Sequence, residues 1–557
     1  MLVDGEQVEE HVTYGELDGR ARSIAARLQE LVRPGEPVLL LQAPGLDYVA
    51  ALFGCLYAGA VAVPAYPPRK NRAAAGLAAL AADAGAAAAL VSREVVARLD
   101  DAAEASVAPV LQWVVTDDGD PASADEWREP PLDGLSLALL QYTSGSTGSP
   151  RGVMLTHANL LHNLTAFHDA HGSGRHTRGV SWLPPYHDMG LIGGLLSPVY
   201  GGFPMVLMSP FAFMERPGRW LRAITRYSAT LSGGPNFAYD LCARKVVPEE
   251  RVGLDLRSWT VAVNGAEPIR AETLERFVAA FGPCGFRRKA FYPSYGLAEA
   301  TLVATGGHPS AEPVTIRVDA AALERNEIVA ADPESRSART LVGCGRPLAG
   351  RVAIVDPESG QPCPSGRVGE IWLQSSSVAA GYWKRAEETE RTFGATLAGS
   401  GSFLRTGDLG AVSDGELFVT GRIKDVLVVD GRNLYAGDIE LLAEVSVAGV
   451  RRGCSAAFAV EVGGRERPVV VLEAEAVTDI AGTAYAVRRA VAKELGVTLH
   501  SVVFVRPGGV QKTSSGKVRR PDCRAAYIDG LLDALGIWQE PVDAAAPPAA
   551  EAAADST

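Results

Sequence analysis

The sequence predicts an α/β protein. It has a large N-terminal domain of several parts, built mainly on parallel sheets with a small β-rich part, and a small α+β C-terminal domain. Strand-like runs alternate with helical periodicity through the first 300 residues, which is typical of parallel sheets covered by helices. From about Val342, short strands separated by Gly and Pro replace this pattern, and a compact mixture of helices and strands follows after about Thr420. A chain of 557 residues can bury such cores without disulfides.

The alternation in the N-terminal part is read from apolar periodicity. Apolar runs of strand length occupy residues 38–42, 61–64, 137–142, 180–183, 204–208, 229–233 and 261–264. Apolar residues recur at helical spacing in residues 45–60, 157–167, 219–227, 236–246 and 270–281. We also expect a helix in the Ala-rich residues 73–89 and a loop in the acidic, Pro-containing residues 117–133.

The remaining elements define the β-rich part and the C-terminal domain. Strands are expected at 351–356, 369–374 and 415–420, and then at 454–460, 467–475 and 501–505, with helices at 437–446 and 485–495. We therefore divide the chain into an N-terminal domain at 1–420, a C-terminal domain at 421–535 and a disordered tail at 541–557. The tail is rich in Ala and Pro and cannot bury a core.

Composition excludes several classes of protein. With 53 basic and 65 acidic residues the net charge is −12, which is unfavourable for non-specific binding to nucleic acid or anionic membranes. Prolines and glycines interrupt the long uncharged stretch 189–214, so we expect buried core there and no stable membrane insertion. The seven cysteines lie at least 19 residues apart, which excludes a zinc ribbon and indicates a reducing cytoplasm. We expect a cytoplasmic monomer.

The segment 142–157, YTSGSTGSPRGVMLTH, is the most informative part of the chain. Its glycines and small hydroxyl residues leave many backbone N–H groups and hydroxyls free to bind a polyphosphate. The pattern G-x-x-x-x-G-K-[ST] of a P-loop is absent, and so is the G-x-S-x-G of an α/β-hydrolase. From this segment alone, a surface Ser/Gly turn remains the alternative.

TSGSTGSPRG resembles the phosphate loop of the adenylate-forming superfamily, which comprises acyl-CoA synthetases, peptide-synthetase adenylation domains and luciferases. Further segments match in the same order: YPSYGLAEATL (292–302), FLRTGDLG (403–410), GRIKDVLVVDGRNLYAGDIE (421–440) and QKTSSGKVRR (511–520). WLPPYHDMGLIGGLLSPVYGG (182–202), GGPNFAYDLC (233–242) and NGAEPIRAETLERF (264–277) are similar to the fatty acyl-AMP ligases within that superfamily. The resemblance extends from about Thr13 to Leu531.

This resemblance implies a two-step reaction that needs ATP and Mg²⁺. A medium- or long-chain fatty acid is converted to acyl-AMP with release of pyrophosphate. The acyl group then passes to the phosphopantetheine thiol of an acyl carrier protein, for polyketide, lipopeptide or complex lipid biosynthesis. In this family the C-terminal domain is mobile between the steps. A fatty acyl-CoA synthetase is the close alternative, and a non-catalytic acyl-adenylate binding protein is an alternative of another class.

One length supports the acyl-AMP ligase branch. Gly343 follows Glu299 by 44 positions, a longer connection than in ordinary acyl-CoA ligases. The extra residues, about 313–339, resemble the insertion that restrains the C-terminal domain in acyl-AMP ligases and disfavours the coenzyme A reaction. An ordinary long loop is the alternative.

The resemblance assigns the nucleotide site residue by residue. It implies that ATP or AMP contacts Thr143, Ser144, Gly145, Ser146, Thr147, Gly148, Arg151, Gly265, Ala266, Glu267, Tyr295, Gly296, Asp408 and Arg422. Tyr295 would face the adenine, and Asp408 would accept both ribose hydroxyls. Without the resemblance, Tyr295 reads as core and Asp408 as a turn cap. Arg151 stands where the family usually has lysine, and a planar guanidinium binds phosphate differently.

Catalytic and acyl-binding residues follow in the same way. The resemblance implies that Lys517, Glu299 and His187 are catalytic, that Glu299 and Thr147 hold Mg²⁺, and that Lys424 is the hinge. It places the acyl chain against Met189, Gly190, Asn236, Phe237 and Tyr239. Without the resemblance, Glu299 would be interpreted as an acid favoured at a helix N-terminus, Lys517 as a solvated side chain and His187 as a structural residue.

Overall fold

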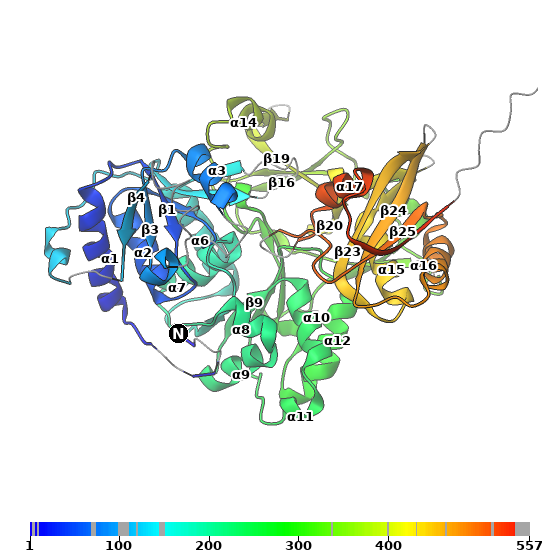
Figure 1. Ribbon diagram of the computed structural model, residues 1–557, viewed down its shortest axis with the longest axis horizontal. Coiled ribbons are helices and arrows are strands. Elements are labelled where there is room, and N and C mark those ends of the chain that lie inside the picture. Colours follow the sequence, from blue (N-terminus) through cyan, green and yellow to red (C-terminus); the bar gives the residue numbers. More distant parts are fainter. Residues whose placement is uncertain are drawn as a thin grey trace, which may run out of the picture. The chain divides into compact units, whose positions relative to one another are not determined.

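The computed structural model describes residues 1–2, 6–7, 10–67, 74–97, 111–117, 121–143, 151–335, 338–397, 400–429, 432–462, 465–513 and 517–540. The chain divides into two compact units, Met1–Lys424 and Asp425–Thr557, each described here by itself (Figure 1). The sequence places this division four residues earlier, between 420 and 421.

The first sheet of the first unit has six strands in the order β4-β3-β1-β2-β5-β6. They are β1 (Pro37–Leu41), β2 (Val61–Pro64), β3 (Ala88–Val91), β4 (Gln112–Val115), β5 (Leu137–Thr143) and β6 (Arg151–Thr156). All pairings are parallel except that of β5 with β6. Strands β1 to β3 are fully buried, as continuous apolar runs in a parallel sheet require.

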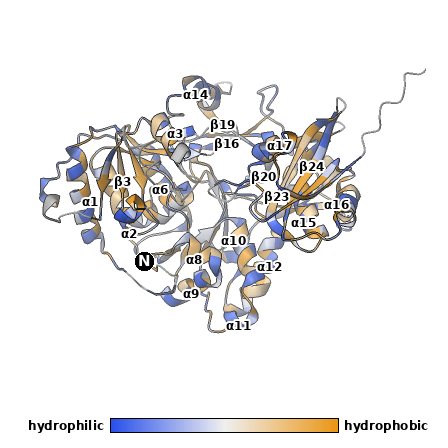
Figure 2. Ribbon diagram, in the orientation of Figure 1, coloured by the Kyte–Doolittle hydropathy of each residue, from blue (hydrophilic) through white to orange (hydrophobic). Residues whose placement is uncertain are grey.

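Helices cover this sheet. They are α1 (Tyr14–Gln29), α2 (Leu46–Tyr57), α3 (Ala74–Ala84), α4 (Arg93–Val96) and α6 (His157–His171). Thr13 and Glu16 form a capping box that begins α1, and Thr156 begins α6 in the same way with Asn159. In Figure 2, α1 carries both hydrophilic and hydrophobic residues, as a helix with one packed face does.

The second sheet has seven strands in the order β15-β12-β11-β10-β9-β7-β8. Its parallel members are β7 (Gly179–Ser181), β8 (Met205–Leu207), β9 (Leu231–Gly234), β10 (Val261–Asn264) and β11 (Phe291–Tyr295), and β12 (Thr305–Gly306) and β15 (Arg346–Pro347) are antiparallel. The helices are a π-helix η2 (Met189–Leu196), α7 (Ser197–Gly201), α8 (Pro210–Glu215), α9 (Gly218–Tyr227), α10 (Asn236–Lys245), α11 (Pro248–Arg251) and α12 (Ala271–Phe281).

A third part of the first unit is β-rich. It contains β16 (Arg351–Val355), β17 (Gly369–Gln374), β18 (Ala395–Thr396), β19 (Ser402–Ser413), β20 (Glu416–Arg422) and α14 (Ala386–Phe393). The hairpin of β13 (Thr315–Asp319) and β14 (Ala338–Val342), with α13 (Ala320–Glu324) between its strands, occupies the expected insertion. The remaining short helices are η1 (Pro121–Glu126), η3 (Gly282–Cys284), η4 (Arg288–Ala290), η5 (Ala298–Ala300) and η6 (Ile423–Asp425).

The second unit is α+β. A four-stranded sheet of β23 (Val450–Val462), β24 (Arg465–Ala474), β25 (Ser501–Val505) and β26 (Ala534–Gln539) is accompanied by the β21 (Val426–Val429) and β22 (Arg432–Tyr435) pair. Its helices are α15 (Ala436–Ser446), α16 (Ile480–Leu495) and α17 (Arg520–Ile528). Strand β26 lies partly beyond residue 535, the expected end of this domain. The tail 541–557 lies outside the described residues.

The predicted α/β alternation is confirmed, with local corrections. The expected helix at 73–89 ends at Ala84, and its last residues belong to β3. The second half of segment 142–157 is not loop but strand β6. The loop expected at 117–133 contains η1. In the ranges that the structure describes, no helix is long and apolar enough to cross a membrane, and residues 189–214 are short helices and a strand.

A buried charge network stabilises the second unit. The Arg520 guanidinium donates to both Glu440 oxygens at 2.7 and 2.8 Å and to Asp425 Oδ2 at 2.7 Å. The Glu440 side chain is only 10% exposed. Removing one partner of a buried ion pair leaves an uncompensated charge.

We predict that Arg520→Ala lowers the free energy of unfolding of the second unit by about 3 kcal/mol, measured by urea denaturation. Arg506→Ala is the matched control, because the ion pair of Arg506 with Asp533 is exposed at both ends. This control should change stability by less than about 1 kcal/mol. Equal effects of the two substitutions would contradict the assignment.

Candidate active site

The expected phosphate loop connects two paired strands. Thr143 ends β5 and Arg151 begins β6, and the two residues are register partners. Ser144, Gly145, Ser146, Thr147 and Gly148 lie outside the described residues. The loop therefore leaves the sheet at the carboxyl end of a strand that runs parallel to β2, where open α/β sheets bind ligands.

Arg151, at the exit of this loop, is half-buried and has partners within the first unit. Its guanidinium carbon lies 5.2 Å from the ring centre of Tyr382, and its Nε lies 3.5 Å from Glu388 Oε2. The Tyr382 hydroxyl in turn donates to Glu299 Oε1 at 2.8 Å. Arg151 and Glu299 are thus connected through one tyrosine.

Glu299 lies in η5, directly after β11, and is half-buried. A single carboxylate fits Mg²⁺, which proteins hold through one or two carboxylates together with substrate phosphates. Among the described residues, no group of three or more His, Cys, Asp or Glu could form a metal site by itself. The donor set therefore fits a metal shared with phosphates better than a closed protein site.

Asp408 and Tyr295 meet in the first unit. The Tyr295 hydroxyl donates to Asp408 Oδ2 at 2.8 Å, and Arg422 Nε donates to Asp408 Oδ1 at 2.7 Å. Burial raises the pKa of the Tyr295 hydroxyl well above its ordinary value, and the charge of Asp408 raises it further. Each carboxylate oxygen can accept about two hydrogen bonds, so Asp408 retains capacity for a ligand hydroxyl.

A buried acid supports the turn before Asp408. Glu370 Oε2 accepts from Arg405 at 2.8 and 3.0 Å, and Glu370 Oε1 accepts from the Gly407 N–H at 3.1 Å. Gly407 has φ of 71°, a conformation that costs glycine little. The position of Asp408 is therefore fixed from β17 as well as from β19.

Two of the expected glycines allow the strand ends to approach closely. A Cβ on Gly265, which follows β10, would lie 2.8 Å from Ser294 Oγ, and one on Gly296, which follows β11, would clash with the Leu302 carbonyl oxygen. Ala266 has φ of 67°, and the Glu267 carboxylate accepts from the Phe237 N–H. Because glycine has no Cβ, the ends of β10 and β11 can pack closely against the neighbouring chain at positions where a larger side chain would clash.

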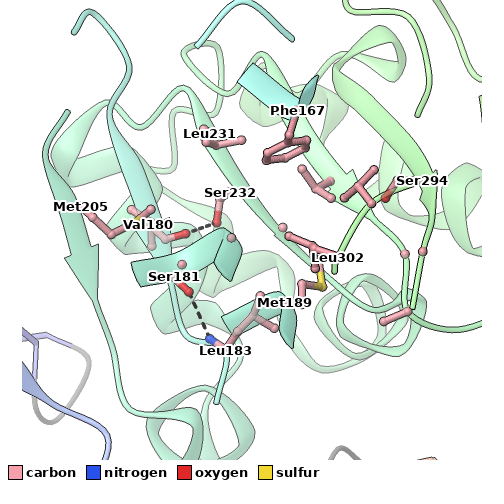
Figure 3. A pocket seen from close by; sticks show the side chains of 18 residues that line it. Phe167, Val180, Ser181, Leu183, Met189, Met205, Leu231, Ser232, Ser294 and Leu302 are labelled. Atoms are coloured by element: carbon pink, nitrogen blue, oxygen red, sulfur yellow. Dashed lines mark hydrogen bonds between the residues drawn. The ribbon is translucent and has the colours of Figure 1, made fainter. Parts of the chain in front are cut away.

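An apolar cavity of about 70 Å³ begins at the same strand ends. Figure 3 shows Met189 and Leu302 projecting into it from one side and Phe167 and Leu231 from another. Its full lining is Phe167, Val180, Ser181, Leu183, Met189, Gly193, Gly194, Met205, Leu231, Ser232, Gly233, Val263, Gly265, Ala266, Ser294, Gly296, Leu302 and Val303. Gly265, Ala266 and Gly296, expected at the nucleotide, therefore share this cavity with Met189, expected at the acyl chain.

Four other residues expected at the acyl chain do not line the cavity. Tyr239 is completely buried in an aromatic core with Trp220 and Trp259, where its hydroxyl donates to the Val263 carbonyl at 2.7 Å. Asn236 bonds to the Thr273 hydroxyl and accepts from the Arg270 N–H. Phe237 packs against that same core, and a Cβ on Gly190 would clash with the Pro184 carbonyl oxygen.

Sequence reasoning missed Phe167 as a cavity residue. Gly193 and Gly194 lie in the apolar stretch 189–214, which the resemblance offers as a whole for the acyl channel, and the Gly-Gly pair is the signal that could have singled them out. Small residues on a buried helix leave space where larger ones would fill it. In the π-helix η2, these glycines face Leu302 and Ser181.

His187 and Lys517 are the remaining catalytic candidates. His187 Nδ1 lies 2.7 Å from Asp188 Oδ1 and accepts from the Met189 N–H at 3.4 Å. Lys517 is exposed in the second unit, and its backbone N–H and carbonyl both bond to Thr513. Lys424 is the last residue of the first unit.

Comparisons with known proteins identify the family of the chain. The family model described as AMP-binding enzyme matches residues 2–383. The chain is similar to the medium-chain fatty acid–acyl carrier protein ligase JamA of Moorena producens (46% identical; 96% of this chain and 92% of the relative). It is also similar to the long-chain fatty acid–AMP ligase FadD32 of Mycolicibacterium smegmatis (38% identical; 94% and 90%). A fatty acyl-adenylate ligase from L. pneumophila, solved with acyl adenylate and pyrophosphate, superposes with a TM-score of 0.74 (39% identical; 96% and 94%).

Substitutions at two buried tyrosines test whether Tyr239 belongs to the hydrophobic core. We predict that Tyr239→Phe lowers the free energy of unfolding by about 1 kcal/mol, because the Val263 carbonyl loses its donor. Tyr292→Phe should be neutral or stabilising, since in the part of the chain that the structure describes the Tyr292 hydroxyl is buried without a partner. Urea denaturation measures both, and a destabilised Tyr292→Phe beside an unchanged Tyr239→Phe would contradict these placements.

Proposed function

The chain belongs to the family of AMP-binding enzymes, and from this premise we propose that it is a fatty acyl-AMP ligase that loads an acyl carrier protein. In the first step a carboxylate oxygen of the fatty acid attacks the α-phosphorus of ATP, and pyrophosphate leaves. In the second, the phosphopantetheine thiol of the carrier attacks the acyl carbon, loses its proton, and AMP leaves. The relatives named for these two activities support the proposal.

The single observation that carries the proposal is the position of the apolar cavity. Gly265, Ala266 and Gly296 line the cavity and also follow the strands whose ends bear the nucleotide candidates. A fatty acid whose acyl chain enters this cavity would place its carboxylate at the ends of β10 and β11. Chain and nucleotide then meet at one edge of the sheet, as an acyl-phosphate bond requires.

We assign the remaining roles from charge. The attack brings a carboxylate towards a phosphorus surrounded by negative oxygens, so cations and donors do most of the work. Lys517 and Arg151 supply positive charge, His187 a donor or acceptor, and Asp408 with Arg422 binds the ribose. Mg²⁺, where bound at Glu299 with Thr147, would neutralise the departing phosphates.

The hairpin in the insertion supports the carrier as acceptor over coenzyme A. Thr315–Asp319 and Ala338–Val342 are paired strands, and the helix Ala320–Glu324 follows the first of them, with Val318 and Leu323 buried. The Ile328 N–H donates to the Gly366 carbonyl at 2.7 Å, and the Val368 N–H donates to the Asn326 carbonyl at 2.8 Å. An ordered hairpin of this kind is suited to restraining a domain, and a few kcal/mol suffices because about 1.4 kcal/mol is tenfold in rate.

We predict that the full chain with ATP, Mg²⁺ and dodecanoic acid forms acyl-AMP, loads a pantetheinylated carrier and makes little acyl-CoA, as measured by mass spectrometry. Replacing residues 317–340 by an Asn-Gly turn keeps buried Leu341 and Val342. This variant should gain acyl-CoA formation while adenylation survives. The control is the carrier without its pantetheine arm.

The other outcomes identify the rivals. Efficient acyl-CoA synthesis by the intact chain would favour a fatty acyl-CoA synthetase. Nucleotide binding without acyl-AMP from any fatty acid would favour a non-catalytic acyl-adenylate binding protein.

The cavity also makes a prediction about chain length. A Cβ on Gly193 would make ordinary contact, 3.6 Å from Leu302 Cδ2, so a larger side chain there extends into the cavity. We predict that Gly193→Leu lowers adenylation of dodecanoic acid at least about tenfold while butanoic acid is activated as before, measured by pyrophosphate release. Gly76→Leu is the control, because a Cβ there meets nothing within 4 Å. Equal losses of adenylation for dodecanoic and butanoic acid would show that the acyl chain does not bind in this cavity.

A further inference from the structure

A short segment between β17 and α14 joins two parts of the first unit. We call residues 379–385, AAGYWKR, the strap. Its backbone pairs with β6: the Ala380 N–H donates to Met154 O, the Met154 N–H to Gly381 O, and the Trp383 N–H to Gly152 O, at 2.8–2.9 Å. The Ala379 N–H donates to the Glu299 carbonyl at 2.9 Å. One extended segment is therefore bonded to the strand that Arg151 begins and to the backbone of Glu299.

The outer end of the strap is anchored as well. Trp383 Nε1 donates to the Ala84 carbonyl at 2.9 Å, and Arg385 forms an ion pair with Asp83 at 2.6 Å. Asp83 also accepts from the Tyr142 hydroxyl at 2.6 Å, and Tyr142 lies on β5, directly before Thr143. The strap is thus fixed to both strands that border the expected phosphate loop.

Tyr382 is the strap residue whose side chain lies between the two site residues. It is 4% exposed, its ring contacts Phe393 edge-on at 5.2 Å, and its other neighbours are Arg151 over the ring and Glu299 at the hydroxyl. Burial and the negative charge of Glu299 raise the pKa of its hydroxyl. The hydroxyl therefore remains a donor to Glu299 at any physiological pH.

We propose that Tyr382 is a positioning residue. Its hydroxyl positions one carboxylate oxygen of Glu299, and its ring positions the planar guanidinium of Arg151. The distance between the Glu299 carboxylate and the Arg151 guanidinium is thereby fixed. The inference rests on the proposed function, which gives Glu299 and Arg151 their task at the phosphates. It also gives a reason for arginine at 151, because a planar guanidinium stacks on an aromatic face whereas a lysine ammonium is a compact point charge.

A double-mutant cycle tests this coupling, because it isolates an interaction between two side chains. Tyr382→Phe keeps the ring and removes only the hydroxyl. We expect it to lower kcat for acyl-AMP formation about tenfold and to weaken MgATP binding severalfold by calorimetry. In a Glu299→Gln background, the same substitution should change either quantity less than about twofold.

Two further variants separate positioning from folding. Tyr57→Phe removes a hydroxyl that donates to Asp18 Oδ1 at 2.9 Å, and it should leave rate and binding unchanged. Glu299→Asp keeps the charge but withdraws it from Tyr382 by one methylene, so it too should become insensitive to Tyr382→Phe. Melting temperatures of all variants report any loss of fold.

The outcomes distinguish the two levels of the argument. Equal losses from Tyr382→Phe in the wild-type and Glu299→Gln backgrounds, or no loss in either, would overturn the positioning role. If the wild type makes no acyl-AMP with any fatty acid, the proposed function fails. The calorimetric cycle for MgATP then still decides whether Tyr382 acts through Glu299.

Discussion

The pairing of the strap with β6 is the constraint on which the geometry of the site depends. The first sheet supplies the strands around the expected phosphate loop, and the second supplies Tyr295 and Glu299. Residues of both sheets, among them Val153 of β6 and Tyr292 of β11, pack in one hydrophobic core with Tyr382. Backbone hydrogen bonds from Ala379 to Glu299 and from Ala380 and Trp383 to β6 add a directional constraint to this packing. Because such bonds do not depend on side-chain rotamers, they fix the acid more firmly than a surface ion pair could.

Close packing of the strand ends beside the apolar cavity is the second constraint. Gly265 and Gly296 bring the ends of β10 and β11 against Ser294 and Leu302. The cavity beside these glycines has apolar walls that include Met189 and Met205, and methionine side chains adapt to ligands of different shape. The polar groups, Asp408, Tyr295 and Arg422, belong to the neighbouring turn and strand pair. An apolar tail and a charged head can therefore be bound at one edge.

Much of the fold could be predicted from the sequence because its strands are short apolar runs between clear helical periods. Residues 61–64 and 261–264 match β2 and β10 at both ends. The helix expected at 73–89 is too long, because the chain turns at Gly85, which has φ of 68°, and Ala88 and Ala89 begin β3.

The residues of the candidate site, like the fold, could be predicted from the sequence only in part. Motif residues such as Asp408, Tyr295 and Glu299 are found by resemblance, and the structure brings the first two into hydrogen-bond contact. The resemblance places Tyr239 at the acyl chain, but a motif cannot distinguish a residue of the cavity wall from the core behind it, and Tyr239 is completely buried against Trp220 and Trp259. Tyr382 was missed because its role comes from two contacts with residues far away in sequence.

The measurement that tests the central claim most directly is exchange of labelled pyrophosphate into ATP. The account predicts exchange that requires a fatty acid and is lost in Glu299→Gln, whereas exchange that is absent with every fatty acid, or that is undiminished in Glu299→Gln, would contradict it.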